Sequence, residues 1–216
     1  MIEDVSLKII ILGASTVGKT TIFLRYFHQN YTQVLSTMGI DFKTKFFKFD
    51  DKKMKINYID TAGQEKFKSI SENYLKGTDG VILVFDLTNK ETFDLVTYWH
   101  ECMKKNNKSN IGKILFGNKN DLEDKREVTY EEGKELANSI GCDYYEGSAM
   151  SGENIDFVMN EIAKLSYNEW KKTGDNRNSI RLSSVGYIDI ENTKKKPTFF
   201  LFVFKSFFLY PSAEQY

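Results

Sequence analysis

Residues 7–20 read Leu-Lys-Ile-Ile-Ile-Leu-Gly-Ala-Ser-Thr-Val-Gly-Lys-Thr. The apolar run ending at Leu12 predicts a strand, and Gly13 to Thr20 follow it with the spacing G-x-x-x-x-G-K-S/T. A strand, a loop of this spacing and a helix predict a phosphate-binding loop, because backbone N–H groups and the helix N-terminus then face an anion. The alternative is a glycine-containing turn that binds nothing. The strand, the spacing and the Lys-Thr pair together disfavour it.

Each part of this loop has an expected role. Gly13 and Gly18 let the backbone turn tightly and close on a phosphate. Lys19 is expected to reach the β- and γ-phosphates and to stabilise the charge on the transferring group, and Thr20 to place its hydroxyl on Mg²⁺. The other candidate nucleotide-binding residues here are Ser15, Thr16, Val17 and Thr21.

The composition narrows the class of protein. The 216 residues carry 30 basic and 30 acidic side chains, and a net charge of zero gives no basic field for nucleic acid. The two cysteines, Cys102 and Cys142, lie far apart without metal-ligand spacing, which favours a reducing compartment. The N-terminus does not read as a signal peptide, and no apolar run reaches the roughly 18–20 residues of a membrane span. We therefore expect a cytoplasmic protein.

The order of elements predicts an α/β fold of the P-loop NTPase type. Strands and helices alternate, which favours a mostly parallel six-stranded sheet with helices on both faces. A short polar turn at 50–53 predicts an antiparallel hairpin, hence one antiparallel strand. Predicted strands are 7–12, 40–49, 54–59, 81–86, 113–117 and 142–146; predicted helices are 18–28, 66–76, 91–106, 130–139 and 153–171. We expect one domain over 1–172, followed by a tail over 173–216.

Two further segments point to a γ-phosphate and Mg²⁺. Asp60 follows the third predicted strand and is placed to hold Mg²⁺ through its water shell. Gly63 offers a backbone N–H to the γ-phosphate, and Gln64 can orient an attacking water. Thr37 lies before the second strand and offers a hydroxyl to Mg²⁺ and an N–H to the γ-phosphate. A loop ordered only by that phosphate would act as a switch.

Two more segments point to guanine. In the run Asn118-Lys119-Asn120-Asp121, the carboxylate of Asp121 can accept the N1–H and the 2-amino hydrogen of guanine, a donor pair that adenine lacks. The aliphatic stem of Lys119 can cover the base. After the sixth strand, Ala149 offers an N–H to the guanine O6, within the candidate segment Ser148, Ala149 and Met150.

With these five segments in order, the chain resembles the Ras-like small GTPases over residues 5 to about 170 and is most similar to the Rab family. The Rab-type segments are 39–42, 66–70, 74–77 and 83–88. The resemblance implies the fold, GTP/GDP cycling, Mg²⁺ and partners in vesicle traffic, and it places Tyr31 edge-to-face over the guanine.

The chain also departs from that pattern. Rab proteins usually carry Trp at the position of Ile59, where it forms an effector-binding trio with Phe42 and Tyr74. Met150 replaces the usual Lys, although the contact expected there is a backbone one. Thr16 occupies a position that is often Gly or Ala, and the segment between Tyr31 and Thr37 is one residue short. Because of these changes, the effector surface and the segment that covers the γ-phosphate are expected to differ from those of typical Rab proteins.

The predicted tail differs most from Rab proteins, which typically end in prenylated cysteines. No cysteine follows Cys142, so we expect no prenylation at this terminus. Three lysines at 194–196 precede an aromatic stretch at 199–210. Three alternatives stay open: an interfacial membrane anchor, an added or aggregation-prone strand, and non-native translated sequence.

We therefore expect a Rab-like switch that hydrolyses GTP slowly and regulates vesicle traffic on the cytosolic face of an endomembrane. As partners we expect an exchange factor, a GTPase-activating protein and effectors through 33–45 and 62–76, with no nucleic acid and a monomeric chain. The alternatives are a nucleotide-locked scaffold with little hydrolysis, a Ras/Rho-like signalling GTPase and an adenine-binding ATPase, which Asp121 disfavours.

Overall fold

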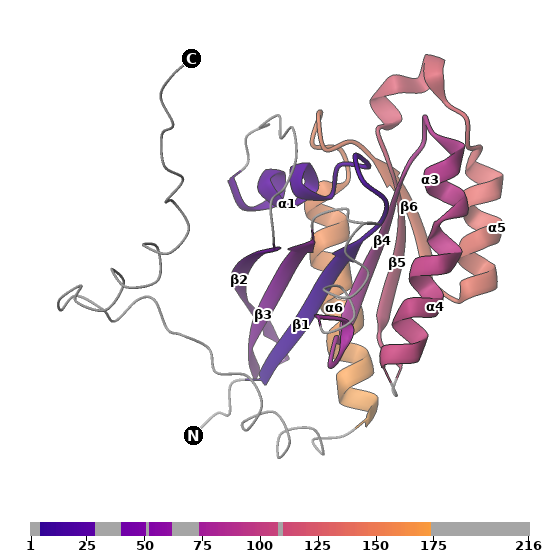
Figure 1. The fold of residues 1–216 in the computed structure, drawn as a ribbon. Helices are drawn as coiled ribbons and strands as arrows, with labels where there is room; N and C mark the ends of the chain where they lie inside the picture. The colour runs from indigo at the N-terminus through magenta and orange to yellow at the C-terminus, as the bar shows by residue number, and fades with distance from the viewer. Residues whose placement is uncertain (1–4, 29–39, 51, 62–73, 108–109, 174–216) are drawn as a thin grey trace, which may run out of the picture. The chain divides into compact units, whose positions relative to one another are not determined.

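The computed structural model describes residues 5–28, 40–50, 52–61, 74–107 and 110–173 (Figure 1). The chain divides into two units, Met1–Asn176 and Arg177–Tyr216, and the second lies outside the described residues. The interpretations of the lysines at 194–196 and of the aromatic stretch therefore stay predictions. In the part that the structure describes, no helix is long and apolar enough to cross a membrane.

The described elements alternate as the sequence predicts. In chain order they are β1 (Val5–Leu12), α1 (Lys19–His28), β2 (Ile40–Phe49), β3 (Lys52–Thr61), β4 (Gly80–Asp86), α3 (Lys90–Asp94), α4 (Val96–Asn106), β5 (Gly112–Asn118), the 3₁₀ helix η1 (Asn120–Lys125), α5 (Tyr130–Ile140), β6 (Asp143–Gly147) and α6 (Ile155–Thr173).

The strands form a six-stranded sheet in the order β2-β3-β1-β4-β5-β6. Only β2 runs antiparallel, paired with β3, and the other neighbours are parallel, which confirms the predicted fold class. The register sets Asp86 beside Asn118, and Asn118 beside Gly147. The carboxyl ends of β4, β5 and β6 therefore meet at one edge, where open α/β sheets bind ligands.

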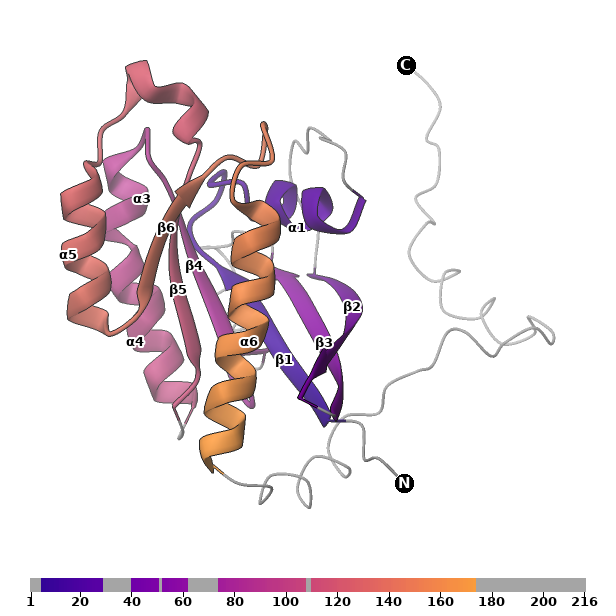
Figure 2. The same cartoon turned by 180° about the vertical axis from the view of Figure 1, so that it is seen from behind.

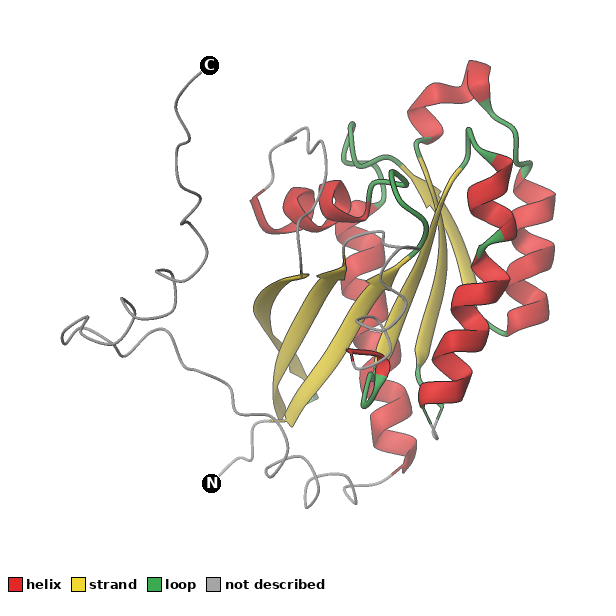
Figure 3. Ribbon diagram, viewed as in Figure 1, coloured by secondary structure: helices red, strands yellow, loops and turns green. Residues whose placement is uncertain are grey.

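Helices cover both faces of the sheet. Figures 1 and 2 show α1 and α6 on one face and α3, α4 and α5 on the other, and Figure 3 shows the strands between them. Alternate residues of β1 divide between the two cores: Ile9 and Ile11 pack with α1 and α6, and Ile10 packs with the other helices. All seven residues of β4 are buried. The strand is parallel to its neighbours and covered on both faces, and for that reason its sequence is a nearly continuous apolar run.

One predicted helix differs from the structure, and another lies largely outside the described residues. The helix predicted at 91–106 is wrong as a single element, because the chain forms α3 and α4 with a break at Leu95. The N–H of Leu95 bonds to both Glu91 O and Phe93 O, which tightens the backbone at that residue. The helix predicted at 66–76 lies largely outside the described residues. The other boundaries shift by at most two residues, as helix and strand ends commonly do.

Candidate nucleotide-binding site

The loop after β1 is closely packed at both of its framing glycines. A Cβ on Gly13 would collide with the Val84 carbonyl oxygen of β4. Gly18 has a φ of +94°, and a Cβ there would collide with the side-chain amide of Asn118. The glycines thus let the loop close against two neighbouring strands, as the sequence predicts for an anion cradle.

Lys19 lies at the start of α1 with only 4% of its surface exposed. Its ammonium donates to the carbonyl oxygen of Ala14 at 2.6 Å, so the side chain folds back over the loop. A cation held at a helix N-terminus, above a loop of backbone N–H groups, is a ready site for phosphate. Half-buried Thr20 and Thr21 follow it on the same helix.

Thr16 adopts a left-handed backbone conformation, with a φ of +64°. A β-branched residue is strained there, because its Cβ crowds the following carbonyl. Its side chain is exposed, so no packing compensates for the strain. The departure noted in the sequence is therefore a point of backbone strain within the loop.

We predict that Thr16→Gly raises the free energy of unfolding by about 1 kcal/mol, because glycine adopts a positive φ without strain. Its larger loss of backbone entropy on folding offsets only part of that gain. Urea unfolding of the full chain with Mg²⁺·GDP would measure it. Ser15→Gly is the matched control, because Ser15 has no positive φ, and it should lower stability. Equal losses in both variants would contradict strain at Thr16.

Asp60, near the end of β3, is fully buried. Neither carboxylate oxygen accepts a hydrogen bond of standard geometry from a described residue. Burial raises the pKa of Asp60 to about 6, although the Thr20 hydroxyl and the Lys19 ammonium pull that pKa down. A buried carboxylate with unsatisfied oxygens beside a threonine hydroxyl fits a divalent cation with hard oxygen ligands, such as Mg²⁺.

We predict that Asp60→Asn stabilises the GDP-bound protein in EDTA at pH 7.5 by up to about 3 kcal/mol. A folded-state pKa above the ordinary value means that the ionised carboxylate costs stability above pH 6, a cost that vanishes as the pH falls below about 4. With Mg²⁺ the sign should reverse, because the cation stabilises the carboxylate. Thermal unfolding in both buffers measures the difference, and a loss of stability in both would contradict the assignment.

Asn118 joins three segments at the end of β5. Its amide Nδ2 donates to the Val17 carbonyl oxygen at 2.7 Å, within the phosphate loop. Its Oδ1 accepts from the Ala149 N–H at 3.0 Å, in the segment after β6. Asn118 is 2% exposed. One buried side chain therefore fixes the predicted phosphate and guanine segments relative to each other.

The other guanine candidates lie around this junction. Asp121 is exposed on η1, a short 3₁₀ helix that was not among the predicted helices. Ser148 is buried, and its hydroxyl accepts from the N–H groups of Met150 and Ser151. The Met150 side chain is exposed. The Ala149 N–H, predicted for the guanine O6, here has the Asn118 oxygen as its partner.

Four predicted site residues lie outside the described residues: Tyr31, Thr37, Gly63 and Gln64. The structure describes all three residues at the positions of the effector-binding trio, namely Phe42, Ile59 and Tyr74. Ile59 is buried, while Phe42 is 49% exposed and its ring centroid lies 6.1 Å from that of Tyr74. Phe42 stands opposite Ile59 across the β2–β3 pair. The aliphatic replacement thus belongs to the core beneath the two aromatic rings.

Asp86 was not among the residues predicted for the site, although it closes β4 at the edge where the site lies. Its carboxylate forms an ion pair with Lys119. An acidic residue that ends an otherwise apolar buried strand is the signal that would have singled it out.

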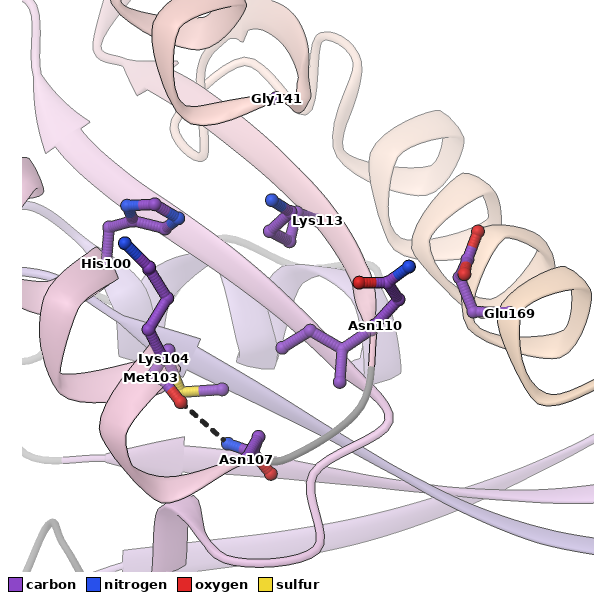
Figure 4. A pocket seen from close by; sticks show the side chains of 9 residues that line it. His100, Met103, Lys104, Asn107, Asn110, Lys113, Gly141 and Glu169 are labelled. Atoms are coloured by element: carbon purple, nitrogen blue, oxygen red, sulfur yellow. Dashed lines mark hydrogen bonds between the residues drawn. The ribbon is translucent and has the colours of Figure 1, made fainter. Parts of the chain in front are cut away.

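A cavity of about 500 Å³ lies elsewhere, toward the opposite ends of the strands. Figure 4 shows it lined by side chains from α4, β5 and α6, among them Lys104, Lys113 and Glu169. Lys113 stands near the start of β5, whereas the candidate site lies at the end of that strand. This cavity therefore does not coincide with the candidate nucleotide site.

Comparison with known proteins identifies the family of the chain. Residues 8–168 match the model of the Ras family. The chain is 38% identical to the GTP-binding protein ypt2 of Schizosaccharomyces pombe over 74% of this chain and 81% of that protein. It is 35% identical to the Ras-related protein Rab-8B of Homo sapiens over 91% and 95% of the two chains, and 41% identical to human Rab-3A over 75% and 74%. The chain belongs to the Ras family and is similar to the Rab proteins within it.

Proposed function

We propose that this chain is a Rab-type switch that binds GTP and GDP with Mg²⁺, hydrolyses GTP and regulates membrane traffic. The observation that carries the proposal is the buried Asn118, which ties the phosphate loop at Val17 to the guanine segment at Ala149. A phosphate cradle and a base-reading carboxylate, Asp121, then belong to one site. The Rab relatives support the same activity and role.

Each described residue has a proposed task. The loop N–H groups and the Lys19 ammonium hold the phosphates and stabilise the charge that develops on the transferring group. Asp60 and the Thr20 hydroxyl hold Mg²⁺, which, when bound, neutralises charge on the β- and γ-oxygens. Asp121 and the Lys119 stem hold the base. The rest of the nucleotide contacts fall to Ser15, Thr16, Val17, Gly18, Thr21, Ser148, Ala149 and Met150.

The residues outside the described part complete the proposal. Thr37 adds a ligand to Mg²⁺, Tyr31 covers the guanine, Gly63 bonds the γ-phosphate, and Gln64 orients the attacking water. We propose a single GTPase domain over 1–172 and a tail over 173–216.

The proposed partners are proteins that move the chain between its GDP-bound and GTP-bound states or that recognise one of these states. An exchange factor, a GTPase-activating protein and effectors would contact 33–45 and 62–76. No residue of the sequence stands out as an arginine finger supplied in cis, so the activating arginine would come from a partner. The chain would act as a monomer on the cytosolic face of an endomembrane.

The nucleotide that accompanies the purified full chain tests the proposal. Denatured protein should release about one equivalent of GDP or GTP, because tight guanine binding survives purification. Chromatography of the supernatant identifies the base. Release of adenine nucleotide, or a chain that cannot be loaded with GDP in Mg²⁺ buffer, would refute it.

We predict that Gln64→Leu leaves GTP binding intact and abolishes hydrolysis stimulated by an activating protein, because leucine cannot orient the attacking water. Phosphate release with and without that partner measures the effect. Stimulation of about 10⁵-fold, a value taken from the related GTPase Ras, sets the scale of the loss. Stimulated turnover equal to that of the wild type would refute the role of Gln64.

A further inference from the structure

Asp86 and Lys119 form an ion pair beside the proposed base site. Asp86 is the last residue of β4, and Asn118, the last residue of β5, is its neighbour in register. Lys119 follows directly, and its ammonium lies 2.5 Å from the Oδ2 of Asp86. The pair therefore bridges the ends of two central strands.

Hydrogen bonds other than the one to Lys119 also hold the carboxylate of Asp86 in place. Its Oδ1 accepts from the backbone N–H and the hydroxyl of Thr88, at 2.9 and 2.7 Å. Its backbone N–H donates to the Thr92 hydroxyl at 3.0 Å. These bonds leave Oδ2 for Lys119, and only 7% of the Asp86 side chain is exposed. A buried acceptor with one oxygen directed to a cation gives a defined anchor.

Lys119 is held at its backbone as well. It adopts a left-handed conformation, with φ +71° and ψ +35°, between β5 and η1. Asn118 before it bonds the phosphate loop, and the helix after it carries Asp121. With backbone and ammonium both fixed, the aliphatic stem between them has little rotamer freedom left to lose when a base packs on it.

We propose that Asp86 is a positioning residue for the guanine nucleotide. Asp86 holds the Lys119 stem in the conformation that covers the base, and it thereby slows nucleotide release. The inference rests on the proposed function and deepens it. In this proposal Asp86 acts through Lys119, with which it forms an ion pair, and not by contact with the nucleotide.

Removing the charge tests the pair without removing its hydrogen bonds to Thr88. In Asp86→Asn the amide oxygen can still accept from Thr88, but the amide nitrogen faces the ammonium and cannot hold it. Release of a fluorescent GDP analogue (mant-GDP) should become about 10-fold faster, the scale of one charge-assisted hydrogen bond.

A double-mutant cycle separates positioning from a local structural role. Lys119→Met keeps an unbranched stem and lacks the ammonium. In that background Asp86→Asn should change mant-GDP release less than about 2-fold, because no ion pair is left to break. If Asp86 acted only through its bonds to Thr88, any acceleration that Asp86→Asn caused would be the same in both backgrounds.

The measurement is a chase of mant-GDP from the full chain with excess GDP in Mg²⁺ buffer. Asp50→Asn is the matched control, because it breaks an exposed Lys171–Asp50 pair of 3.0 Å away from the site and should leave release unchanged. No acceleration in Asp86→Asn, or equal acceleration in both backgrounds, overturns the inference. Failure of the wild type to bind mant-GDP would instead refute the proposed function itself.

Discussion

Replacing Asn118 by alanine is expected to weaken GDP binding about 100-fold, through the loss of two buried hydrogen bonds. The Val17 carbonyl and the Ala149 N–H would each lose a partner that no water replaces easily, because Asn118 is 2% exposed. Each unsatisfied buried group costs about 1–3 kcal/mol. The phosphate and guanine segments would then no longer be held in one geometry.

Competition of GDP against mant-GDP measures this loss. Asn57→Ala is a matched control, because the Asn57 amide also bridges two partners, accepting from Thr44 and donating to Ser6, both at 2.9 Å. That bridge crosses three strands away from the candidate site, so GDP affinity should stay within about 2-fold of the wild type. An Asn118→Ala protein with an affinity as high as that of Asn57→Ala would contradict the role given to Asn118.

Asp121→Asn is expected to weaken GDP binding about 1,000-fold or more and to favour xanthosine diphosphate instead. Guanine presents two donors, N1–H and the 2-amino group, and a carboxylate accepts both with charge assistance. The amide offers one acceptor and directs its own donors at the amino group. Xanthine carries a carbonyl at that position, so the amide matches it. Discrimination on this scale is typical of a site that hydrogen-bonds its ligand.

Parallel titrations with the two diphosphates measure the switch. Glu123→Gln is the control, because it removes one negative charge from the same short helix, where Glu123 pairs with Arg126. GDP preference should survive in that variant. If Asp121→Asn still preferred GDP over the xanthine nucleotide, Asp121 would not be the residue that reads the base.

The sheet and its order of elements were predictable from sequence because the central strands, such as β4, are buried on both faces. Continuous apolar runs such as that of β4 mark them without any long-range information. The short polar turn at 50–53 likewise predicted the antiparallel pair. The break at Leu95 was not predictable, because the helical spacing of apolar residues continues through it.

The site was predictable as a set of segments but not as a set of contacts. Spacing identified the phosphate loop and Asp121, since those residue types follow one another along the chain. The bridge from Asn118 to Val17 joins residues 101 positions apart, which no local pattern encodes. The pairing of Lys119 with Asp86 arises in the same way, because the register of β4 and β5 sets Asp86 beside Asn118.

Single-turnover hydrolysis by the purified full chain tests the central claim most directly. With radiolabelled GTP and Mg²⁺, we predict slow phosphate release on the order of 10⁻⁴ s⁻¹, a rate taken from the related GTPase Ras, and no release from ATP. Release should stop in EDTA, because the proposed ligands Thr20 and Asp60 then hold no cation. GTP that stays bound and intact for a day, or ATP hydrolysed as fast as GTP, would contradict a Mg²⁺-dependent guanine-nucleotide switch.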